Sequence, residues 1–300
     1  MQSRNYTDIK IIAESTLKTR IEAFDDFLSN DGGFVVGSSI FLTGTSGAGK
    51  TTLAIILQKL FEDYITSLYS REMSCSSVKQ QMKRYAIEHK NAFISDVQMC
   101  PTIDSYIADL DEMKPSVVII DSLQVIIKED YSDVPLEKAT YELIQKLRAW
   151  TEKNEAILIV IGHVNKDGGF EGKNTIEHMF DAHLRMIFDK AKNTRTLTWS
   201  KNRKGDVAKV LFYLFGSKSI EFYTPEQYQR IKEKKDLEDF VLDAISTYLN
   251  SLDKSTEVYK EFRKDLKKGF NTISENGDSY LNQTIKCIEL IKEKVGKFGL

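Results

Sequence analysis

Between about residues 39 and 223, short apolar runs alternate with longer stretches of helical periodicity. This alternation predicts an α/β fold with a mainly parallel sheet. The run Val117–Ile120 consists of β-branched residues without polar alternation, as is typical of a strand covered on both faces. The predicted strands are Ser39–Thr43, Ile65–Tyr69, Ala92–Ser95, Val117–Asp121 and Ala156–Gly162.

Helical periodicity separates several of these strands. The segment Ser76–His89 places apolar residues on one side of a helix, and Pro135–Asn154 begins with a proline suited to a first turn. After residue 183 the hydrophobic period changes to two, which predicts antiparallel strands that extend the sheet. These strands are His183–Asp189, Thr194–Lys201, Lys209–Phe215 and Ser219–Tyr223.

Beyond Tyr223 the chain becomes rich in Lys, Glu, Asp, Leu and Ile, and no strand pattern remains. The periodicity there predicts amphipathic helices at about 236–250, 255–270 and 279–297. A charged helical tail is typical of a solvated packing appendage, and the alternative is a surface for a protein partner. We therefore predict three regions: an N-terminal segment (1–18), an α/β domain (19–224) and a C-terminal helical region (225–300).

The composition is that of an ordinary globular protein, with 42 Lys and Arg against 44 Asp and Glu. This balance argues against a surface coated in basic charge, although a local basic groove could still bind nucleic acid. The N-terminus has charges where a signal peptide needs an apolar run, and every apolar run is far shorter than the roughly 20 residues that span a bilayer. Cys75, Cys100 and Cys287 lack CxxC spacing, which predicts reduced thiols in a cytoplasmic protein.

The segment from Gly44 to Thr51 fits the phosphate-binding pattern GxxxxGK[ST]. Glycines in such a loop let backbone N–H groups surround the phosphates, Lys50 neutralises phosphate charge, and the Thr51 hydroxyl is a ligand for Mg²⁺. An apolar strand precedes the loop and a helical pattern follows it, as this motif requires. The sequence thus predicts ATP and Mg²⁺ bound by Gly44, Thr45, Ser46, Gly47, Ala48, Gly49, Lys50, Thr51 and Thr52.

Two carboxylates follow predicted strands. Asp121 ends the buried strand, where it could hold Mg²⁺ beside the phosphate-binding loop, and the alternative is a cap for the next helix. Glu72 follows the strand Ile65–Tyr69, where it could orient and deprotonate the attacking water. Taken by itself, a Glu at this place is usually a surface residue.

Several strings together resemble the RecA-like ATPases, most closely the RadA/Sms recombination ATPases, with similarity to DnaB-type helicase motors. The resemblance covers about residues 19–223. Besides the P-loop, it rests on SREMS (70–74), IIDSLQ (119–124), the segment from IGHVNK to EHMFDAHL (161–184) and WSKNRKGD (199–206).

The resemblance implies a RecA-like ATPase domain and roles for individual residues. Glu72 would be the catalytic base, and His163 would sense the γ-phosphate; otherwise His163 is an ordinary histidine at a strand end. Lys201 and Arg203 would reach into a neighbouring subunit's site as an arginine finger, which implies a homo-oligomeric ring or filament. The alternative for this pair is a solvated basic turn. His178 and His183 are interpreted as structural.

In RecA-like proteins, loops corresponding to Gln124–Val134 and Asn165–Asn174 contact single-stranded DNA. The second loop carries Lys166, Phe170 and Lys173, a combination suited to phosphate contact and base stacking. The first loop offers Lys128 among several acidic residues, so the indication there is weaker. Both could instead be ordinary solvated loops.

The chain also departs from these families. RadA proteins carry an N-terminal zinc module, but no cysteine precedes residue 40 here. The region 224–300 is too short and too helical for the Lon-like domain of RadA. The N-terminal assembly domain of DnaB helicases is also missing. Lys204 replaces the aromatic residue of the KNRFG signature, and TR at 19–20 stands where TG is common. We predict an ATP-dependent motor on single-stranded DNA in recombination, repair or replication. The alternatives are a reduced DnaB-like helicase and a KaiC-like regulatory or scaffold ATPase with a protein partner.

Overall fold

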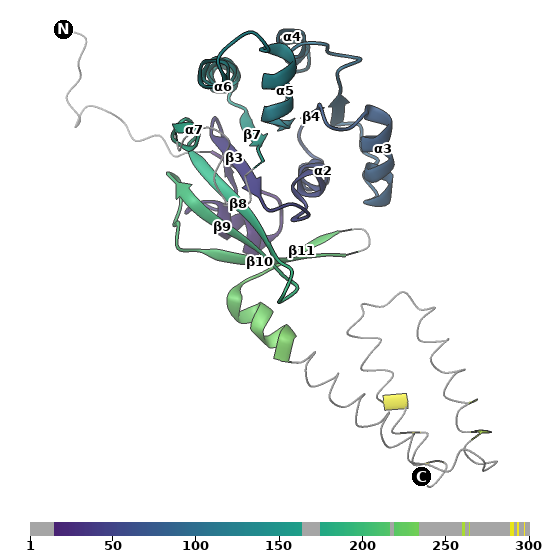
Figure 1. Cartoon of the computed structure of the whole chain (residues 1–300). Helices are drawn as coiled ribbons and strands as arrows, with labels where there is room; N and C mark the ends of the chain where they lie inside the picture. Colours follow the sequence, from purple (N-terminus) through teal and green to yellow (C-terminus); the bar gives the residue numbers. More distant parts are fainter. Residues whose placement is uncertain are drawn as a thin grey trace. The chain divides into compact units, whose positions relative to one another are not determined.

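The computed structural model describes residues 15–163, 175–216 and 219–233, with isolated positions further on (Figure 1). Contacts divide the chain into two compact units, residues 1–225 and 226–300. The first unit carries the site and is described below. The helices predicted at 236–250, 255–270 and 279–297 lie outside the described residues, apart from those isolated positions.

The larger unit is built on a nine-stranded sheet with the order β11-β10-β9-β8-β3-β7-β6-β4-β5. Each predicted strand agrees with an observed strand to within one residue at both ends. The strands are β3 (Ser39–Gly44), β4 (Thr66–Ser70), β5 (Ala92–Ser95), β6 (Val117–Asp121), β7 (Ile157–Ile161), β8 (Ala182–Asp189), β9 (Thr194–Asn202), β10 (Val210–Phe215) and β11 (Ile220–Tyr223). A separate antiparallel pair joins β1 (Thr16–Leu17) to β2 (Phe34–Val35).

One strand direction differs from the prediction. The segment His183–Asp189 was expected to be antiparallel, but β8 runs parallel to β3 and only its other neighbour, β9, is antiparallel. The reason is topological. After β7 ends, β8 begins at the end of the sheet where β3 also begins, so β8 runs in the same direction as β3. The antiparallel extension therefore starts one strand later, at β9.

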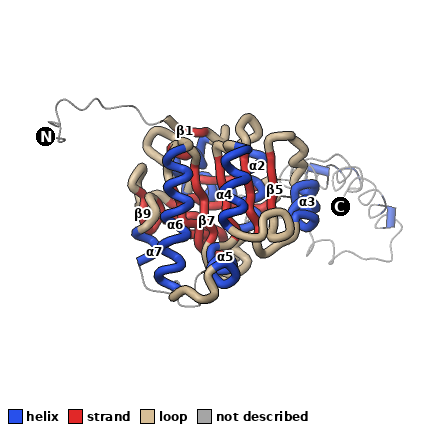
Figure 2. Tube along the Cα trace, turned by 90° about the horizontal axis from the view of Figure 1, so that it is seen from above, coloured by secondary structure: helices blue, strands red, loops and turns tan. Residues whose placement is uncertain are grey.

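Helices cover both faces of the sheet and enclose two hydrophobic cores (Figure 2). Side chains of α1 (Glu22–Leu28), α2 (Lys50–Leu60) and α3 (Cys75–Arg84) contribute to the first core; α4 (Ile103–Met113), α5 (Leu123–Asp130) and α6 (Leu136–Lys153) contribute to the second. In β6, Val117 and Ile119 point into the first core, and Val118 and Ile120 into the second. This explains the unbroken apolar run.

The segment Gln124–Val134 was expected to be a loop, but most of it is helix α5. Leu123, Ile126 and Ile127 have helical spacing and are buried in the second core, which outweighs the polar residues that follow them. Arg71 fixes the end of this helix through ion pairs with Glu129 and Asp130. The prediction that Gln124–Val134, the first candidate DNA contact, forms a loop is therefore wrong.

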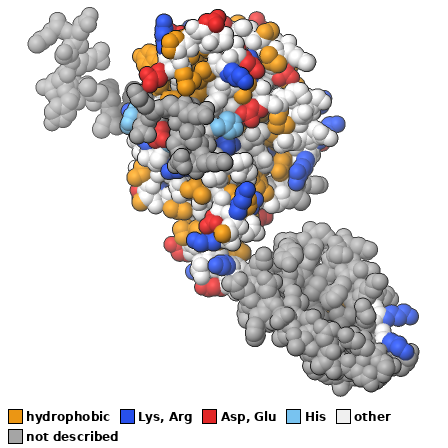
Figure 3. All heavy atoms as spheres, in the orientation of Figure 1, with side chains coloured by type: hydrophobic (Ala, Val, Ile, Leu, Met, Phe, Trp, Pro, Cys, Tyr) orange, Lys and Arg blue, Asp and Glu red, His pale blue; other side chains and the backbone are white. Residues whose placement is uncertain are grey.

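On the face shown in Figure 3, acidic and basic side chains are interspersed, as the balanced composition predicts. Within the described part of the chain, no helix is both long and apolar enough to cross a bilayer.

Candidate active site

The phosphate-binding loop connects the end of β3 to the start of α2. Gly47 and Gly49 have positive φ angles of 78° and 99°, which favour glycine. A Cβ on Gly49 would lie 2.3 Å from the ring of Phe215, so no larger residue fits. The loop is held from β10, where the Tyr213 hydroxyl donates to the carbonyl of Ala48 over 2.7 Å.

Lys50 lies at the bottom of this loop and is 9% exposed. Its Nζ donates to the carbonyl of Gly44 over 3.0 Å. Burial lowers the pKa of Lys50, while the negative charges of Asp121 and Glu72 oppose that shift. The amino group faces a cavity of about 290 Å³, whose lining residues are Gly44, Ser46, Gly47, Gly49, Lys50, Thr51, Thr52 and His163.

Asp121 lies at the carboxyl end of β6 and is buried. Its Oδ2 accepts a hydrogen bond from Thr51 Oγ1 over 2.8 Å, and none of the described residues donates to its Oδ1. Burial raises the pKa of Asp121 to about 6. A buried carboxylate oxygen without a donor, next to a hydroxyl, fits the oxygen ligands that Mg²⁺ prefers. Thr51 and Asp121 would thus hold Mg²⁺, which when bound offsets phosphate charge.

Glu72 follows the end of β4 and points toward the same place. Its Oε1 accepts hydrogen bonds from His163 Nε2 over 2.6 Å and from Ser122 Oγ over 2.5 Å. The hydrogen bond from His163 lowers the pKa of Glu72, although burial opposes the shift. The carboxylate is therefore ionised at neutral pH and able to accept a proton.

His163 follows the end of β7, and its side chain is 48% exposed at the rim of the cavity. Its carbonyl accepts a hydrogen bond from Gln124 Nε2 over 3.0 Å. The fold thus brings Lys50, Asp121, Glu72 and His163 together at the carboxyl ends of β3, β6, β4 and β7, where parallel sheets place their ligand sites.

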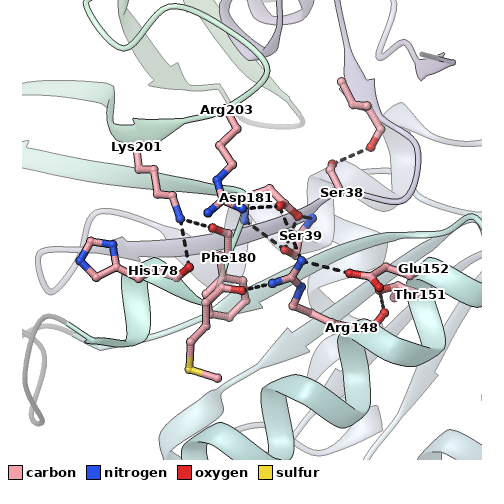
Figure 4. Close-up of polar contacts among 12 residues, drawn as sticks. Ser38, Ser39, Arg148, Thr151, Glu152, His178, Phe180, Asp181, Lys201 and Arg203 are labelled. Atoms are coloured by element: carbon pink, nitrogen blue, oxygen red, sulfur yellow. Dashed lines mark hydrogen bonds and ion pairs between the residues drawn. The ribbon is translucent and has the colours of Figure 1, made fainter. Parts of the chain in front are cut away.

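Lys201 and Arg203 lie at the other end of the sheet, where the parallel strands begin. Lys201 at the end of β9 is paired with His183 at the start of β8, whereas Gly44 of the P-loop is paired with Met186 further along β8. Within the subunit, Lys201 Nζ donates to the carbonyls of residues 177, 178 and 180. Arg203 Nη1 lies 3.3 Å from Asp181 Oδ1, and Figure 4 shows this pair together with the contacts of Lys201 to His178 and Phe180.

Some predicted residues have no described position, and some observed ones were not predicted. Lys166, Phe170 and Lys173 lie in 164–174, outside the described residues. Ser122 contacts Glu72 and Gln124 contacts His163, and neither contact was predicted from the sequence. Their places directly after Asp121, at the edge where the other site residues gather, were the available signal.

Comparisons with known proteins agree with this geometry. The family model described as "ATPase family associated with various cellular activities (AAA)" matches residues 40–194. DNA repair protein RadA of Streptococcus pneumoniae is 28% identical over 228 residues, which cover 73% of this chain and 52% of that protein. DNA repair protein RadA of Escherichia coli is 30% identical over 204 residues, covering 67% and 43%. The chain thus spans about half the length of these relatives.

Among solved structures, a KaiC-like protein from Pyrococcus horikoshii superimposes with a TM-score of 0.58 and 18% identity, covering 70% of this chain and all of that one. This likeness confirms the predicted RecA-like α/β fold. The predicted activity, hydrolysis of ATP with Mg²⁺, is confirmed by the family match and the resemblance to RadA. Since the matched region spans more than half of the sequence and includes the P-loop, the chain belongs to the ATPase family associated with various cellular activities (AAA).

Proposed function

We propose that this ATPase is a motor acting on single-stranded DNA in recombination, repair or replication. The observation that carries the proposal is the place of His163. Its ring forms a hydrogen bond with Glu72, and its backbone leads directly into the glycine-rich segment 164–174, which contains Lys166 and Lys173. A residue placed there can respond to the γ-phosphate and pass the nucleotide state to that segment. The names of the relatives, DNA repair protein RadA, agree with a DNA-related role.

In this proposal each residue at the cavity has one task. The carboxylate of Glu72 takes a proton from water as the water oxygen attacks the γ-phosphorus, and ADP leaves with the bonding electron pair. Lys50 balances the charge of the phosphates, and the backbone N–H groups of the P-loop orient them. Ser122 and His163 hold the Glu72 carboxylate in place.

Lys201 and Arg203 support assembly into a ring or filament. They lie at the opposite end of the strands from the P-loop and are not among the residues that line their own cavity, and a head-to-tail neighbour would bring them to the next cavity. The region 225–300 offers a further surface for a protein partner. We place the protein in the cytoplasm.

Two other functions have support of their own. The similarity of SREMS and KNRKG to DnaB motifs favours a reduced replicative helicase. The KaiC-like fold favours a regulatory or scaffold ATPase with a protein partner. Steady-state ATP turnover with and without single-stranded DNA separates these classes: a several-fold rise is expected for a DNA motor. Unchanged turnover at low salt, where DNA binding is strongest, would favour the regulatory alternative.

Replacing Lys50 by Ala is expected to abolish nucleotide binding, because the phosphates lose the ammonium group that faces them in the cavity. Titration with a fluorescent ATP analogue measures the affinity. The matched control is Lys79→Ala, since Lys79 is exposed on α3. Affinity of Lys50→Ala within two-fold of the unchanged protein would contradict the assignment.

Replacing both Lys166 and Lys173 by Ala is expected to weaken binding of single-stranded DNA for all sequences alike. Each lost phosphate contact should also reduce the salt dependence, by a slope of roughly 0.7 per contact on single strands. Fluorescence anisotropy with labelled oligonucleotides at several salt concentrations measures both effects. The double variant Lys79→Ala, Lys83→Ala on the exposed face of α3 is the control. An unchanged salt slope would exclude this segment as the DNA contact.

A further inference from the structure

His183 is a buried histidine in β8 that takes no part in the hydrolysis of ATP described above. Its exposed fraction is 2%. Nε2 lies 2.7 Å from Thr43 Oγ1, and Nδ1 lies 3.1 Å from Glu177 Oε2 and also contacts Ser200 Oγ. Both ring nitrogens of His183 thus have polar side-chain partners, so His183 does more than fill space in the core.

The two polar ends of this arrangement lie in different functional parts of the fold. Thr43 is in β3, one residue before Gly44, whose carbonyl accepts from the Lys50 ammonium. Glu177 is in α7 (Thr175–His178), the short helix that directly follows residues 164–174. A chain of three side chains therefore joins α7 to the strand that carries the P-loop.

The position of the proton on the His183 ring determines how Glu177 and Thr43 influence each other. Burial lowers the pKa of His183, and the charge of Glu177 opposes that shift while Arg185 and Lys201 add to it. Nδ1 has two partners, the Glu177 carboxylate and the Ser200 hydroxyl; when the neutral ring carries its proton on Nδ1, both oxygens can accept from this N–H. Nε2 then accepts the hydrogen bond of the Thr43 hydroxyl. A shift of Glu177 thus changes which ring nitrogen of His183 carries the proton, and with it whether the Thr43 hydroxyl donates to Nε2 or accepts from it.

An acid, an imidazole and a hydroxyl in this order also have the arrangement of an activated nucleophile. Thr43 is 1% exposed, however, and lies inside β3, so no substrate reaches its oxygen. The arrangement is suited to transmitting position instead.

Other contacts make α7 and β3 respond together. Phe180, just after α7, stacks on Phe41 of β3 with ring centroids 5.0 Å apart. Lys201 donates to the carbonyl of Glu177 and, as Figure 4 shows, to those of His178 and Phe180. These contacts link α7 to β9 and β3, and the side chain of Glu177 reaches His183 in β8, the strand beside β3.

We propose that Glu177, His183 and Thr43 form a relay that couples the position of α7 to the P-loop, so that these three transmit a change at one of these places to the other without taking part in the chemical step. The coupling is reciprocal: nucleotide in the P-loop changes α7, and displacement of α7 changes the P-loop. The proposal rests on the proposed DNA function only for the source of that displacement, the adjacent segment 164–174.

Hydrogen exchange tests the relay without DNA. In the unchanged protein, a non-hydrolysable ATP analogue should alter amide protection in a peptide that covers residues 175–182. Thr43→Val keeps the shape of the side chain but removes the hydroxyl; it should bind the analogue within about two-fold of the unchanged affinity and lose the response of α7. Thr43→Ser restores the hydroxyl and should restore the response. The same response in Thr43→Val as in the unchanged protein, or none in either, would overturn the relay.

A second measurement approaches from α7 and avoids changing a core residue. Glu177→Ala should reduce stimulation of turnover by single-stranded DNA at least about five-fold, the lower end for coupled sites, with basal turnover within two-fold. Glu177→Gln keeps an acceptor oxygen and should retain most of the stimulation, and His178→Gln on the same short helix is the matched control. Full stimulation in Glu177→Ala would count against the relay. Absence of stimulation in the unchanged protein would instead reject the DNA function, while the exchange experiment still decides the relay.

Discussion

Replacing Glu72 by Gln is expected to leave ATP binding unchanged and to lower the rate of hydrolysis by about 10²–10⁴-fold, the range for a lost general base. Gln has nearly the same shape and can still accept the hydrogen bonds from Ser122 and His163. It cannot take a proton from water. The P-loop, Thr51 and Asp121 remain intact, so the affinity for nucleotide should stay.

Two measurements on the same preparation separate these effects: equilibrium binding of an ATP analogue, and single-turnover hydrolysis, which is free of product release. Glu88→Gln, an exposed position after α3, is the control. Turnover of Glu72→Gln at the unchanged rate would remove Glu72 as the base. Loss of binding together with turnover would show a structural role instead.

The sequence predicted the positions of the strands more accurately than those of the helices. The strands β6 and β7 are almost wholly apolar and are buried on both faces, so their apolar runs end where burial ends. Helix α4 was missed, although Ile103, Tyr106 and Leu110 have helical spacing and Thr102 forms a capping box with Ser105. Helix α5 was mistaken for a loop because its buried stripe is only three residues long.

The direction of β8 lay beyond sequence patterns because it depends on where the chain re-enters the sheet. A two-residue period marks a strand but not the direction of its neighbour. The same holds for His183. Its role in linking Glu177 to Thr43 depends on β8 lying beside β3, a pairing between segments about 140 residues apart.

Residues of the nucleotide site were predictable where local motifs determine them. The P-loop pattern specifies both the backbone shape and the residues that touch phosphate, and Asp121 follows from the end of a buried strand. Glu72 needed the family resemblance, since one carboxylate after a strand carries no spacing signal. The positions of Ser122 and Gln124 after Asp121 indicate that they are near the site, but their partners, Glu72 and His163, follow other strands and are known only from the three-dimensional arrangement.

Replacing Arg203 by Ala is expected to retain nucleotide affinity and to lower hydrolysis by at least about 10³-fold, the lower end for loss of an arginine finger. That loss corresponds to about 4 kcal/mol in the barrier. Within its own subunit Arg203 contacts Asp181, which also lies 3.6 Å from Arg148 and accepts from the Ser39 backbone. The Arg203 side chain is 56% exposed, so releasing this contact costs only about 0–1 kcal/mol. A neighbour's γ-phosphate could therefore draw Arg203 away from Asp181.

Mixing subunits determines whether the finger acts in the neighbouring site. Arg203→Ala subunits keep Glu72, and Glu72→Gln subunits keep Arg203, so an interface between the intact Glu72 of one and the intact Arg203 of the other carries no mutation. Co-assembled preparations should then regain part of the activity that neither variant has alone, with a maximum at intermediate ratios. Arg84→Ala, on the exposed end of α3, is the control for loss of a surface arginine. A finger acting within its own subunit predicts no recovery at any ratio. That result, in a preparation shown to co-assemble, would reject the shared site and leave the assignment as an ATPase standing.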